Sequence, residues 1–221
     1  PNQTFRWCTD RMKINPANDF ITDIVAANLK HRGISKGSLV GIYLDKDDRY
    51  VITILSILKC GSIYMPISTV YPEDRVKHML KLGNAKAIIA INDYKWLSDI
   101  CINIINYDSL LIESNNTHIC SYEKAGNEVA YVLFTSGSTG EPKGILIRNH
   151  SVVNLINSMK KELIEDDGEV KVIGVLSQFV FDVTVAQMYL ALLTGNTLEI
   201  IPEEVKFEAN ELMAFLSEKH I

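Results

Sequence analysis

The sequence predicts an α/β fold in which mostly parallel sheets are layered with helices, and three observations support this. Short apolar runs rich in β-branched residues alternate with stretches of helical periodicity, which is the pattern of βαβ units. Of the 221 residues, 47% are apolar and 22% are charged, as in a globular chain that buries a core. The longest apolar run, residues 50–58, is far shorter than the roughly 18 residues that a membrane span needs.

The first half of the chain is expected to alternate strands and helices. Residues 39–44 form an apolar run with β-branched and aromatic members, which predicts a buried strand. A helix follows at 47–60, with Asp47 or Asp48 as N-cap, and its nearly all-apolar surface predicts that both faces are covered. Further elements are expected as strands at 63–67, 87–91 and 101–107, a short helix at 94–100, and a helix that opens at 71–74 with Pro72 in its first position and an inner stripe of Val76, Met79, Leu80 and Leu82.

A polar, loop-like stretch at residues 114–127 is the expected subdomain boundary. The elements predicted after it are a strand at 129–134 that resumes at 145–147, helices at 150–163, 183–193 and 203–219, and strands within 170–181 and at 197–201. The sequence begins at Pro1 without a methionine and stops just after a helical pattern. We therefore expect residues 1–221 to be part of one large N-terminal domain of a longer chain.

Composition and charge argue against several function classes. Lys and Arg number 22 against 27 Asp and Glu, a formal charge of −5, whereas nucleic-acid or anionic-membrane binding needs a basic face. The four cysteines form no C-x-x-C pair and have no histidine at ligand spacing. We therefore predict no metal site and interpret them as reduced thiols of a cytoplasmic protein, since no signal peptide is present.

The stretch from Thr135 to Gly144, T-S-G-S-T-G-E-P-K-G, is the most informative part of the sequence, with four hydroxyl residues, three glycines and one lysine. Glycines let backbone amides approach a ligand, hydroxyls add donors and Lys143 adds a cation, a combination that suits a polyphosphate. A Walker A loop differs, because it has glycine where Pro142 stands and leads into a helix rather than a strand. From composition alone, a solvated hairpin loop is an equal alternative.

The same ten residues match without departure the signature T-S-G-S-T-G-x-P-K-G of the adenylate-forming superfamily, which this chain resembles. That superfamily comprises acyl-CoA synthetases, luciferases and the adenylation domains of nonribosomal peptide synthetases. Other segments agree in the family's order: L-K-C-G-S-I-Y-M-P-I at 58–67, Y-P-E-D-R at 71–75, F-D-V-T-V at 181–185 and L-L-T-G at 192–195. Residues 68–70 depart from the family pattern, with S-T-V in place of D-P-x.

The resemblance implies that the loop binds the β- and γ-phosphates of ATP through its amides and side chains. The phosphate-binding residues it implies are Thr135, Ser136, Gly137, Ser138, Thr139, Gly140, Lys143 and Gly144, the glycines serving backbone geometry. We assign Lys143 as the catalytic residue, because catalysis in such a site consists of positioning and charge neutralisation.

The segment F-D-V-T-V resembles the F-D-x-S-V form of the amino-acid-activating branch, which includes peptide-synthetase adenylation domains and D-alanine–carrier-protein ligases. In that branch the aspartate pairs with the α-ammonium of the substrate, which implies this role for Asp182. Val183 and Ala186 are implied to line the side-chain pocket, which the small Ala186 would make deep. The alternative for Asp182 is a cap on the helix predicted at 183–193, and both roles can hold at once.

The resemblance implies a two-step reaction for the parent protein. The carboxylate of an amino acid attacks the α-phosphorus of ATP and pyrophosphate leaves, after which a carrier-protein pantetheine thiol takes the acyl group. Mg²⁺ is an implied cofactor, with its glutamate ligand expected beyond residue 221. The adenine, ribose and C-terminal motifs are also not found, so we expect residues 1–221 alone to be inactive. The alternatives are an acyl-CoA or aryl-acid ligase, which usually lacks an aspartate at position 182, and a truncated relative that acts as a binding module.

Overall fold

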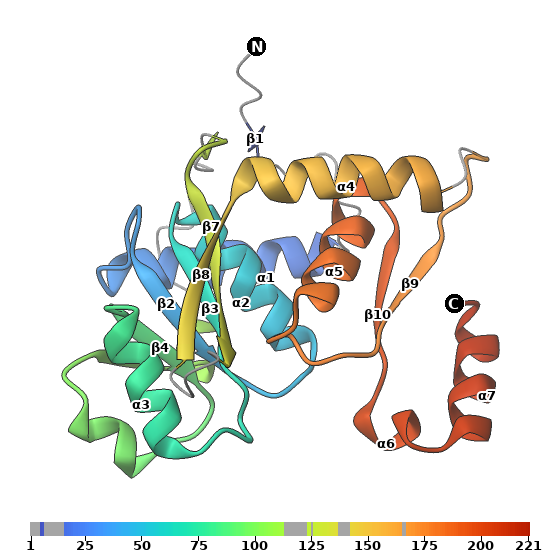
Figure 1. Ribbon diagram of the computed structural model, residues 1–221. Helices are drawn as coiled ribbons and strands as arrows, with labels where there is room; N and C mark the ends of the chain where they lie inside the picture. Colours follow the sequence, from blue (N-terminus) through green and yellow to red (C-terminus); the bar gives the residue numbers. More distant parts are fainter. Residues whose placement is uncertain (1–4, 7–15, 113–122, 125, 137–141, 165–166) are drawn as a thin grey trace. The chain divides into compact units, whose positions relative to one another are not determined.

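The computed structural model describes residues 5–6, 16–112, 123–124, 126–136, 142–164 and 167–221 (Figure 1). It confirms the predicted α/β class with a mostly parallel sheet. The described residues up to Asn149 form one compact unit, and those from His150 to Ile221 form a second. The boundary predicted at 114–127 lies largely outside the described residues and stays a prediction.

The first unit is built on a six-stranded sheet in the order β5-β4-β2-β3-β7-β8 (Figure 1). Its strands are β2 (Leu39–Tyr43), β3 (Ile63–Pro66), β4 (Ala87–Ala90), β5 (Asn103–Asn106), β7 (Val129–Ser136) and β8 (Pro142–Arg148). All neighbouring strands are parallel except β7 and β8, which form an antiparallel hairpin. A separate antiparallel pair joins β1 (Phe5–Arg6) to β6 (Glu123–Lys124). The strands β2 and β4 are buried along their whole length, as the continuous apolar runs in their sequences require.

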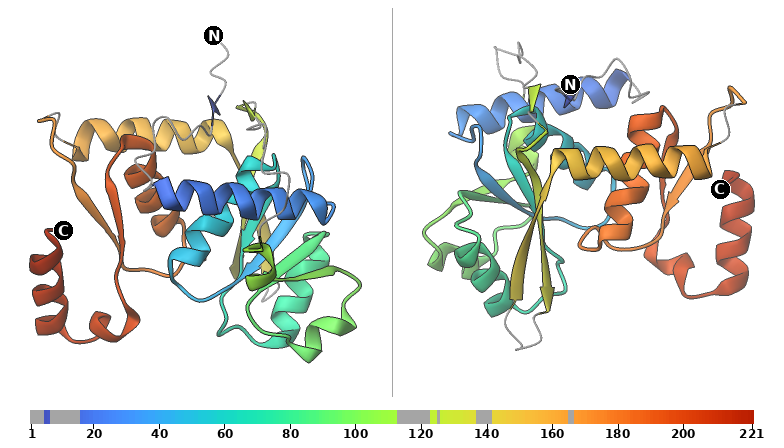
Figure 2. Two further views of the ribbon diagram at one scale, coloured as in Figure 1. Left: turned by 180° about the vertical axis from the view of Figure 1, so that it is seen from behind. Right: turned by 45° about the horizontal axis from the view of Figure 1, so that its top comes forward.

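The described part of this unit has three α-helices: α1 (Pro16–His31), α2 (Asp48–Lys59) and α3 (Glu73–Leu82). Figure 2 shows α1 lying against α2, where the hydroxyl of Ser56 donates to the carbonyl of Thr22 at 3.1 Å. Nearly every residue of α2 is buried, which confirms that its apolar residues are covered on both sides. The helix α1 was not predicted from the sequence.

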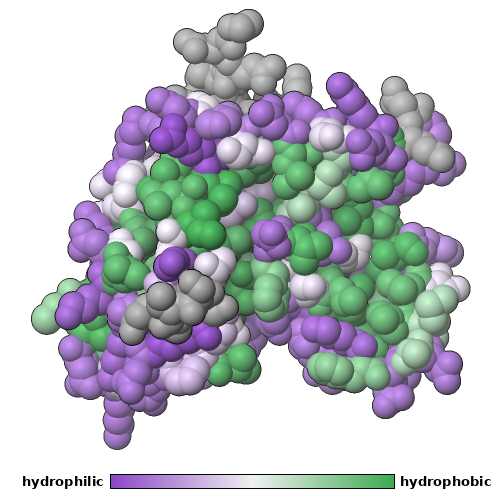
Figure 3. All heavy atoms as spheres, in the orientation of Figure 1, coloured by the Kyte–Doolittle hydropathy of each residue, from purple (hydrophilic) through white to green (hydrophobic). Residues whose placement is uncertain are grey.

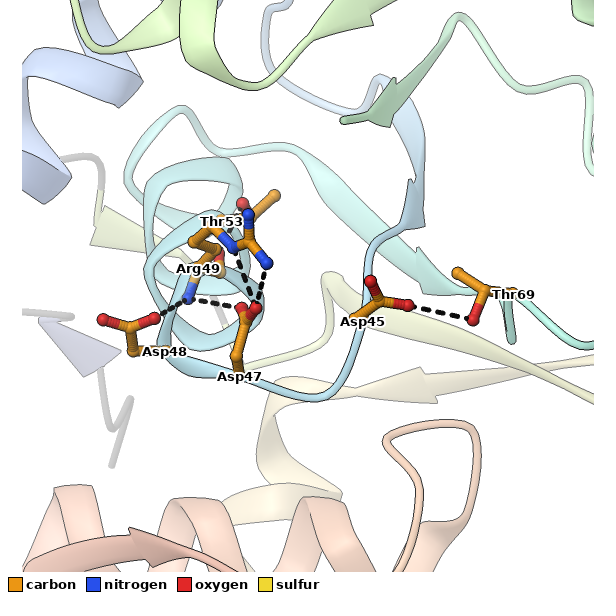
Figure 4. Close-up of polar contacts among 6 residues, drawn as sticks. All are labelled: Asp45, Asp47, Asp48, Arg49, Thr53 and Thr69. Atoms are coloured by element: carbon orange, nitrogen blue, oxygen red, sulfur yellow. Dashed lines mark hydrogen bonds and ion pairs between the residues drawn. The ribbon is translucent and has the colours of Figure 1, made fainter. Parts of the chain in front are cut away.

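The N-terminus of α2 is capped as predicted by Asp47 (Figure 4). Its carboxylate accepts hydrogen bonds from the backbone N–H of Arg49 at 3.0 Å and from the Nε of the same residue at 2.8 Å. Asp45, two residues earlier, instead accepts a hydrogen bond from the hydroxyl of Thr69 at 3.2 Å. Asp47 therefore satisfies a backbone donor that the first turn of the helix leaves open.

Two predictions in this unit were wrong in detail. Leu82 is 56% exposed, whereas Val76, Met79 and Leu80 are buried in the core. The reason is geometric, because a stripe through 76, 79 and 80 continues at 83 and leaves 82 on the opposite side of the helix. Pro72 is the N-cap of α3 rather than its first residue. The short helix expected at 94–100 is a 3₁₀ helix, η1 (Lys95–Asp99), and a second one, η2, spans Asp108–Leu110.

The described residues of the second unit form one parallel strand pair and four helices, the first of which starts at the last residue of the first unit. These elements are α4 (Asn149–Leu163), β9 (Val172–Val175), α5 (Asp182–Thr194), β10 (Thr197–Ile200), α6 (Glu203–Lys206) and α7 (Ala209–Lys219). The helix α5 ends at Gly195, which adopts the left-handed conformation with φ of 78° that glycine tolerates best. The prediction of a single helix at 203–219 is wrong. Two helices form instead, because the chain turns between α6 and α7 at Phe207 and the extended Glu208. No helix among the described residues has the length and apolarity to cross a bilayer.

Candidate functional site

The ten-residue motif lies at the end of the β7–β8 hairpin. Residues 137–141, which include Gly137, Ser138, Thr139 and Gly140, lie outside the described residues. The structure places the motif residues on either side of them, with Thr135 opposite Lys143 and Ser136 opposite Pro142 in the antiparallel register. The motif therefore leads from one strand into another, and no helix begins at its end as in a Walker A loop.

Thr135 is where β7 leaves the core, because the preceding residues from Ala130 to Phe134 are buried and Thr135 is exposed. Its partner Lys143 is exposed on β8, the edge strand of the sheet. Directly opposed residues of an antiparallel pair project from the same face. The side chains of Thr135 and Lys143 thus project from the same face next to the hairpin end, and a hydroxyl and an ammonium placed there could both donate to one anionic ligand.

The edge strand β8 presents an exposed surface along most of its length (Figure 3). Ile145 and Leu146 follow the motif and are 46% and 62% exposed. Figure 3 shows hydrophobic side chains along this strand. Gly144 stands opposite Phe134 in the register, and its φ is not in the positive range that favours glycine.

The second group of predicted residues lies on the first turn of α5. The helix begins at Asp182, one residue earlier than expected, and its N-cap is Phe181, whose side chain makes no capping hydrogen bond. Asp182 is therefore not the N-cap, although its Oδ1 accepts a hydrogen bond from the N–H of Val183 at 2.8 Å. Its carboxylate is exposed at the end of the helix where backbone N–H groups are directed outward.

Ala186 is a neighbour of both Asp182 and Val183 on the helix surface, because residues three and four positions apart lie side by side on a helix. Val183 is 47% exposed, and Ala186 is half-buried. The first turn of α5 thus combines a carboxylate with an apolar side chain and a small one. Such a combination can hold an ammonium group next to an apolar substituent.

The sequence did not identify the polar contacts of the turn that precedes α5, at residues 178–181. The hydroxyl of Thr184 donates to the carbonyl of Gln178 at 2.9 Å, and the Nε2 of Gln178 donates to the Oε1 of Glu203 at 2.8 Å. The threonine is part of the F-D-V-T-V segment, which was its only sequence signal. Gln178 and Glu203 are 25 residues apart and carry no motif.

The described part of the hairpin carries groups that suit a phosphate. Thr135 and Lys143 supply a hydroxyl and a cation to one face of the hairpin, as an anion requires. Within the described part of the chain, no group of three or more His, Cys, Asp or Glu residues is arranged to hold a metal ion.

The sequence profile of the family described as "AMP-binding enzyme" matches residues 22–221. The chain belongs to this family. The adenylate-forming character predicted from the motifs is thereby confirmed, and nonribosomal peptide synthetases are found among its relatives. The site roles of the hairpin and of the first turn of α5 stay predictions.

Two curated relatives are peptide synthases. Bacitracin synthase 1 of Bacillus licheniformis is 30% identical over 199 residues, which cover 89% of this chain and 4% of that protein. Gramicidin S synthase 2 of Brevibacillus brevis is 30% identical over 205 residues, with coverage of 89% and 4%. The chain therefore spans a small part of the length of these relatives.

Two solved structures share the fold of this chain. The N-terminal subdomain of Klebsiella oxytoca NpsA in complex with 3-hydroxyanthranilyl-AMSN matches with a TM-score of 0.75 at 22% identity, covering 91% of this chain and 49% of that one. The o-succinylbenzoate-CoA synthetase of Bacillus subtilis, in complex with an acyl-adenylate intermediate, matches with a TM-score of 0.81 at 15% identity, covering 92% and 53%. This chain spans about half of each.

Proposed function

We propose that the natural protein is an ATP-dependent ligase that activates an amino acid as its adenylate and transfers it to the pantetheine thiol of a carrier protein in the cytoplasm. The family membership of the chain supports the adenylation step. The peptide synthases among its relatives support an amino-acid substrate and a carrier-protein partner.

In the first step, an oxygen of the amino-acid carboxylate forms a bond to the α-phosphorus of ATP, and the bond from that phosphorus to the bridging oxygen breaks as pyrophosphate leaves. Thr135, Ser136, Lys143 and the loop residues 137–140 bind the β- and γ-phosphates. Lys143 neutralises the charge that grows on the leaving pyrophosphate. Mg²⁺ would add further charge neutralisation when bound, and a glutamate expected outside residues 1–221 would hold it.

In the second step, the sulfur of the pantetheine thiolate attacks the acyl carbon and AMP leaves, so that a thioester forms. The exposed carboxylate of Asp182 on the first turn of α5 is the observation that carries the amino-acid branch of the proposal. It binds the α-ammonium and thereby sets the orientation of the substrate carboxylate. Val183 and Ala186 line the side-chain pocket, and the small Ala186 leaves depth for a substrate side chain.

Amino-acid-dependent ATP–pyrophosphate exchange by the natural full-length polypeptide tests this function. Each amino acid is compared with the matching carboxylic acid that lacks the α-amine. We expect the unmodified protein to prefer the amino acid and Asp182→Asn to lose most of that preference. Asp167→Asn, at an exposed aspartate of the same unit that pairs with Lys171, is the matched control and should keep the preference. Equal exchange with both substrate classes in the unmodified protein contradicts the proposal.

We also propose that residues 1–221 expressed alone do not catalyse the exchange, because the solved structures that share the fold are about twice as long. Steady exchange by this purified piece would show that the described hairpin and helix suffice for adenylation. ATP binding without turnover remains compatible with the proposal, since the hairpin supplies phosphate ligands of its own.

A further inference from the structure

The turn that leads into α5 is held by a buried hydroxyl. The carbonyl of Gln178 accepts one hydrogen bond from the backbone N–H of Phe181 at 3.1 Å and a second from the hydroxyl of Thr184 at 2.9 Å. Thr184 is fully buried, so a water molecule could not replace the Gln178 carbonyl as the acceptor for its hydroxyl. The carbonyl and the hydroxyl thus tie the turn at residues 178–181 to the first turn of the helix.

The same turn is also tied to α6. The side-chain amide of Gln178 donates to the carboxylate of Glu203 at 2.8 Å, and Glu203 is the first residue of α6. Glu203 additionally forms an ion pair with Lys206 at 3.6 Å. Gln178 therefore joins three segments through its two polar groups, with its carbonyl toward α5 and its side chain toward α6.

Asp182 is the residue whose placement depends on these contacts. It follows the turn directly, and the hydrogen bond that the structure gives its carboxylate goes to the N–H of Val183, within the same helical turn. The direction of the carboxylate is therefore set by the backbone at the start of α5. If the turn could shift, Asp182 would move with it. Even a small displacement of its carboxylate would worsen the alignment with the substrate that it binds.

We propose that Thr184, Gln178 and Glu203 are positioning residues that hold Asp182 toward the α-ammonium of the substrate. This inference rests on the proposed function of Asp182. It assigns to the buried threonine a role in amino-acid affinity, separate from the stability that any buried hydrogen bond contributes.

The test measures amino-acid KM, ATP KM and kcat in the exchange reaction of the natural full-length polypeptide. Thr184→Val removes the hydroxyl at nearly constant volume and is expected to raise amino-acid KM about 5- to 10-fold with ATP KM unchanged. Thr184→Ser keeps the hydroxyl and should restore a KM near the original. The matched control is Thr53→Val, since Thr53 is equally buried and donates to the carbonyl of Arg49 at 2.7 Å in the other unit. It should lower the melting temperature without changing amino-acid KM.

A second set of variants avoids the helix interior. Glu203→Ala removes the acceptor of Gln178 together with the ion pair to Lys206, whereas Glu203→Gln keeps an oxygen acceptor. Lys206→Ala leaves that acceptor in place and removes the ion pair and the contact of the ammonium with the Phe207 ring, 5.7 Å from its centroid. We expect about a threefold rise in amino-acid KM for Glu203→Ala and values near the original for the other two. An equal rise in amino-acid KM for Glu203→Ala and Lys206→Ala would overturn the positioning role of Glu203.

Asp182→Asn separates failure of this inference from failure of the proposed function. If Asp182→Asn leaves amino-acid KM unchanged, the proposed function fails and the inference fails with it. If Asp182→Asn raises the KM but Thr184→Val and Glu203→Ala do not, the inference alone is overturned. In the Asp182→Asn background, Thr184→Val should not raise amino-acid KM any further. Thr184 acts through the Asp182 carboxylate, which this variant has already replaced by a neutral amide. A full additional effect there would contradict the inference.

Discussion

The ring of Phe134 lies across the Cα of Gly144, its cross-strand partner in the β7–β8 hairpin. A Cβ atom at position 144 would stand 3.2 Å from the Cζ of this ring and 3.4 Å from the Cγ1 of Val132. The last glycine of the motif is therefore explained by space rather than by a positive φ. It allows the strand that carries Lys143 to pack closely against the buried end of β7.

Gly144→Ala is expected to lower the free energy of unfolding by about 1–3 kcal/mol, because the added methyl group must displace the Phe134 ring. Phe134→Leu removes part of the ring and should relieve that crowding. Urea denaturation of the two single variants and the double variant measures the coupling. Strictly additive losses would show that the two residues do not compete for the same space.

Asp47→Ala is expected to cost about 1 kcal/mol of unfolding free energy, because α2 loses its N-cap. Asp47→Asn keeps a capping oxygen and should cost less. Asp45→Ala is the control, since Asp45 contacts the hydroxyl of Thr69 and does not cap the helix. Thermal or chemical denaturation ranks the three variants, and an equal loss for Asp45→Ala and Asp47→Ala would contradict the capping role.

Cys60 and Cys101 are expected to differ sharply in reactivity. Burial raises the pKa of the Cys60 thiol to about 12, and its sulfur donates to the carbonyl of Ala26 at 3.3 Å, whereas Cys101 is exposed. Alkylation by iodoacetamide at about pH 8, followed by peptide mass spectrometry, should label Cys101 first and Cys60 only after unfolding, because the thiolate is the reactive form. Equal rates for both thiols in the folded protein would refute this expectation.

The free energy of unfolding should decrease as the pH rises above about 9. Burial raises the pKa of tyrosine and cysteine side chains, which are uncharged in their protonated form. The pKa of Tyr107 rises from 10.0 to about 12, and that of Cys60 from 9.0 to about 12. The folded state retains these protons after the unfolded state has lost them, so the stabilisation is complete below pH 9 and is lost as the pH approaches 12. Urea titrations from pH 7 to 11 measure the slope, and Tyr107→Phe should reduce it.

The parallel core could be predicted from sequence because its strands are continuous apolar runs. The strands β2, β3 and β4 sit within one residue of their expected bounds. The helix α1 was missed because polar residues such as Asp19, Asp23 and Asn28 interrupt its apolar pattern. The break between α6 and α7 carries no glycine or proline, so nothing local in the sequence marks it.

Residues of the candidate site could be predicted from the sequence where they lie within short motifs. Lys143 and Asp182 were predicted as site residues because each lies in a recognisable segment. The pairing of Thr135 with Lys143 depends on the hairpin register, which composition does not determine. The contact between Gln178 and Glu203 joins residues that are distant in the chain, and such contacts arise only from the folded arrangement of the turn and α6.

The central claim, that the β7–β8 hairpin binds the phosphates of ATP, is tested most directly by replacing its cation. ATP kcat/KM is measured in the exchange reaction of the full-length polypeptide for Lys143→Ala and Arg148→Ala. Arg148 is an exposed cation on the same strand, but it lies five residues further on and projects from the opposite face. We expect Lys143→Ala to lower ATP kcat/KM at least about tenfold, as for a charge that contacts phosphate. Arg148→Ala should lower it little. Equal values for both variants and the unmodified protein would contradict the claim.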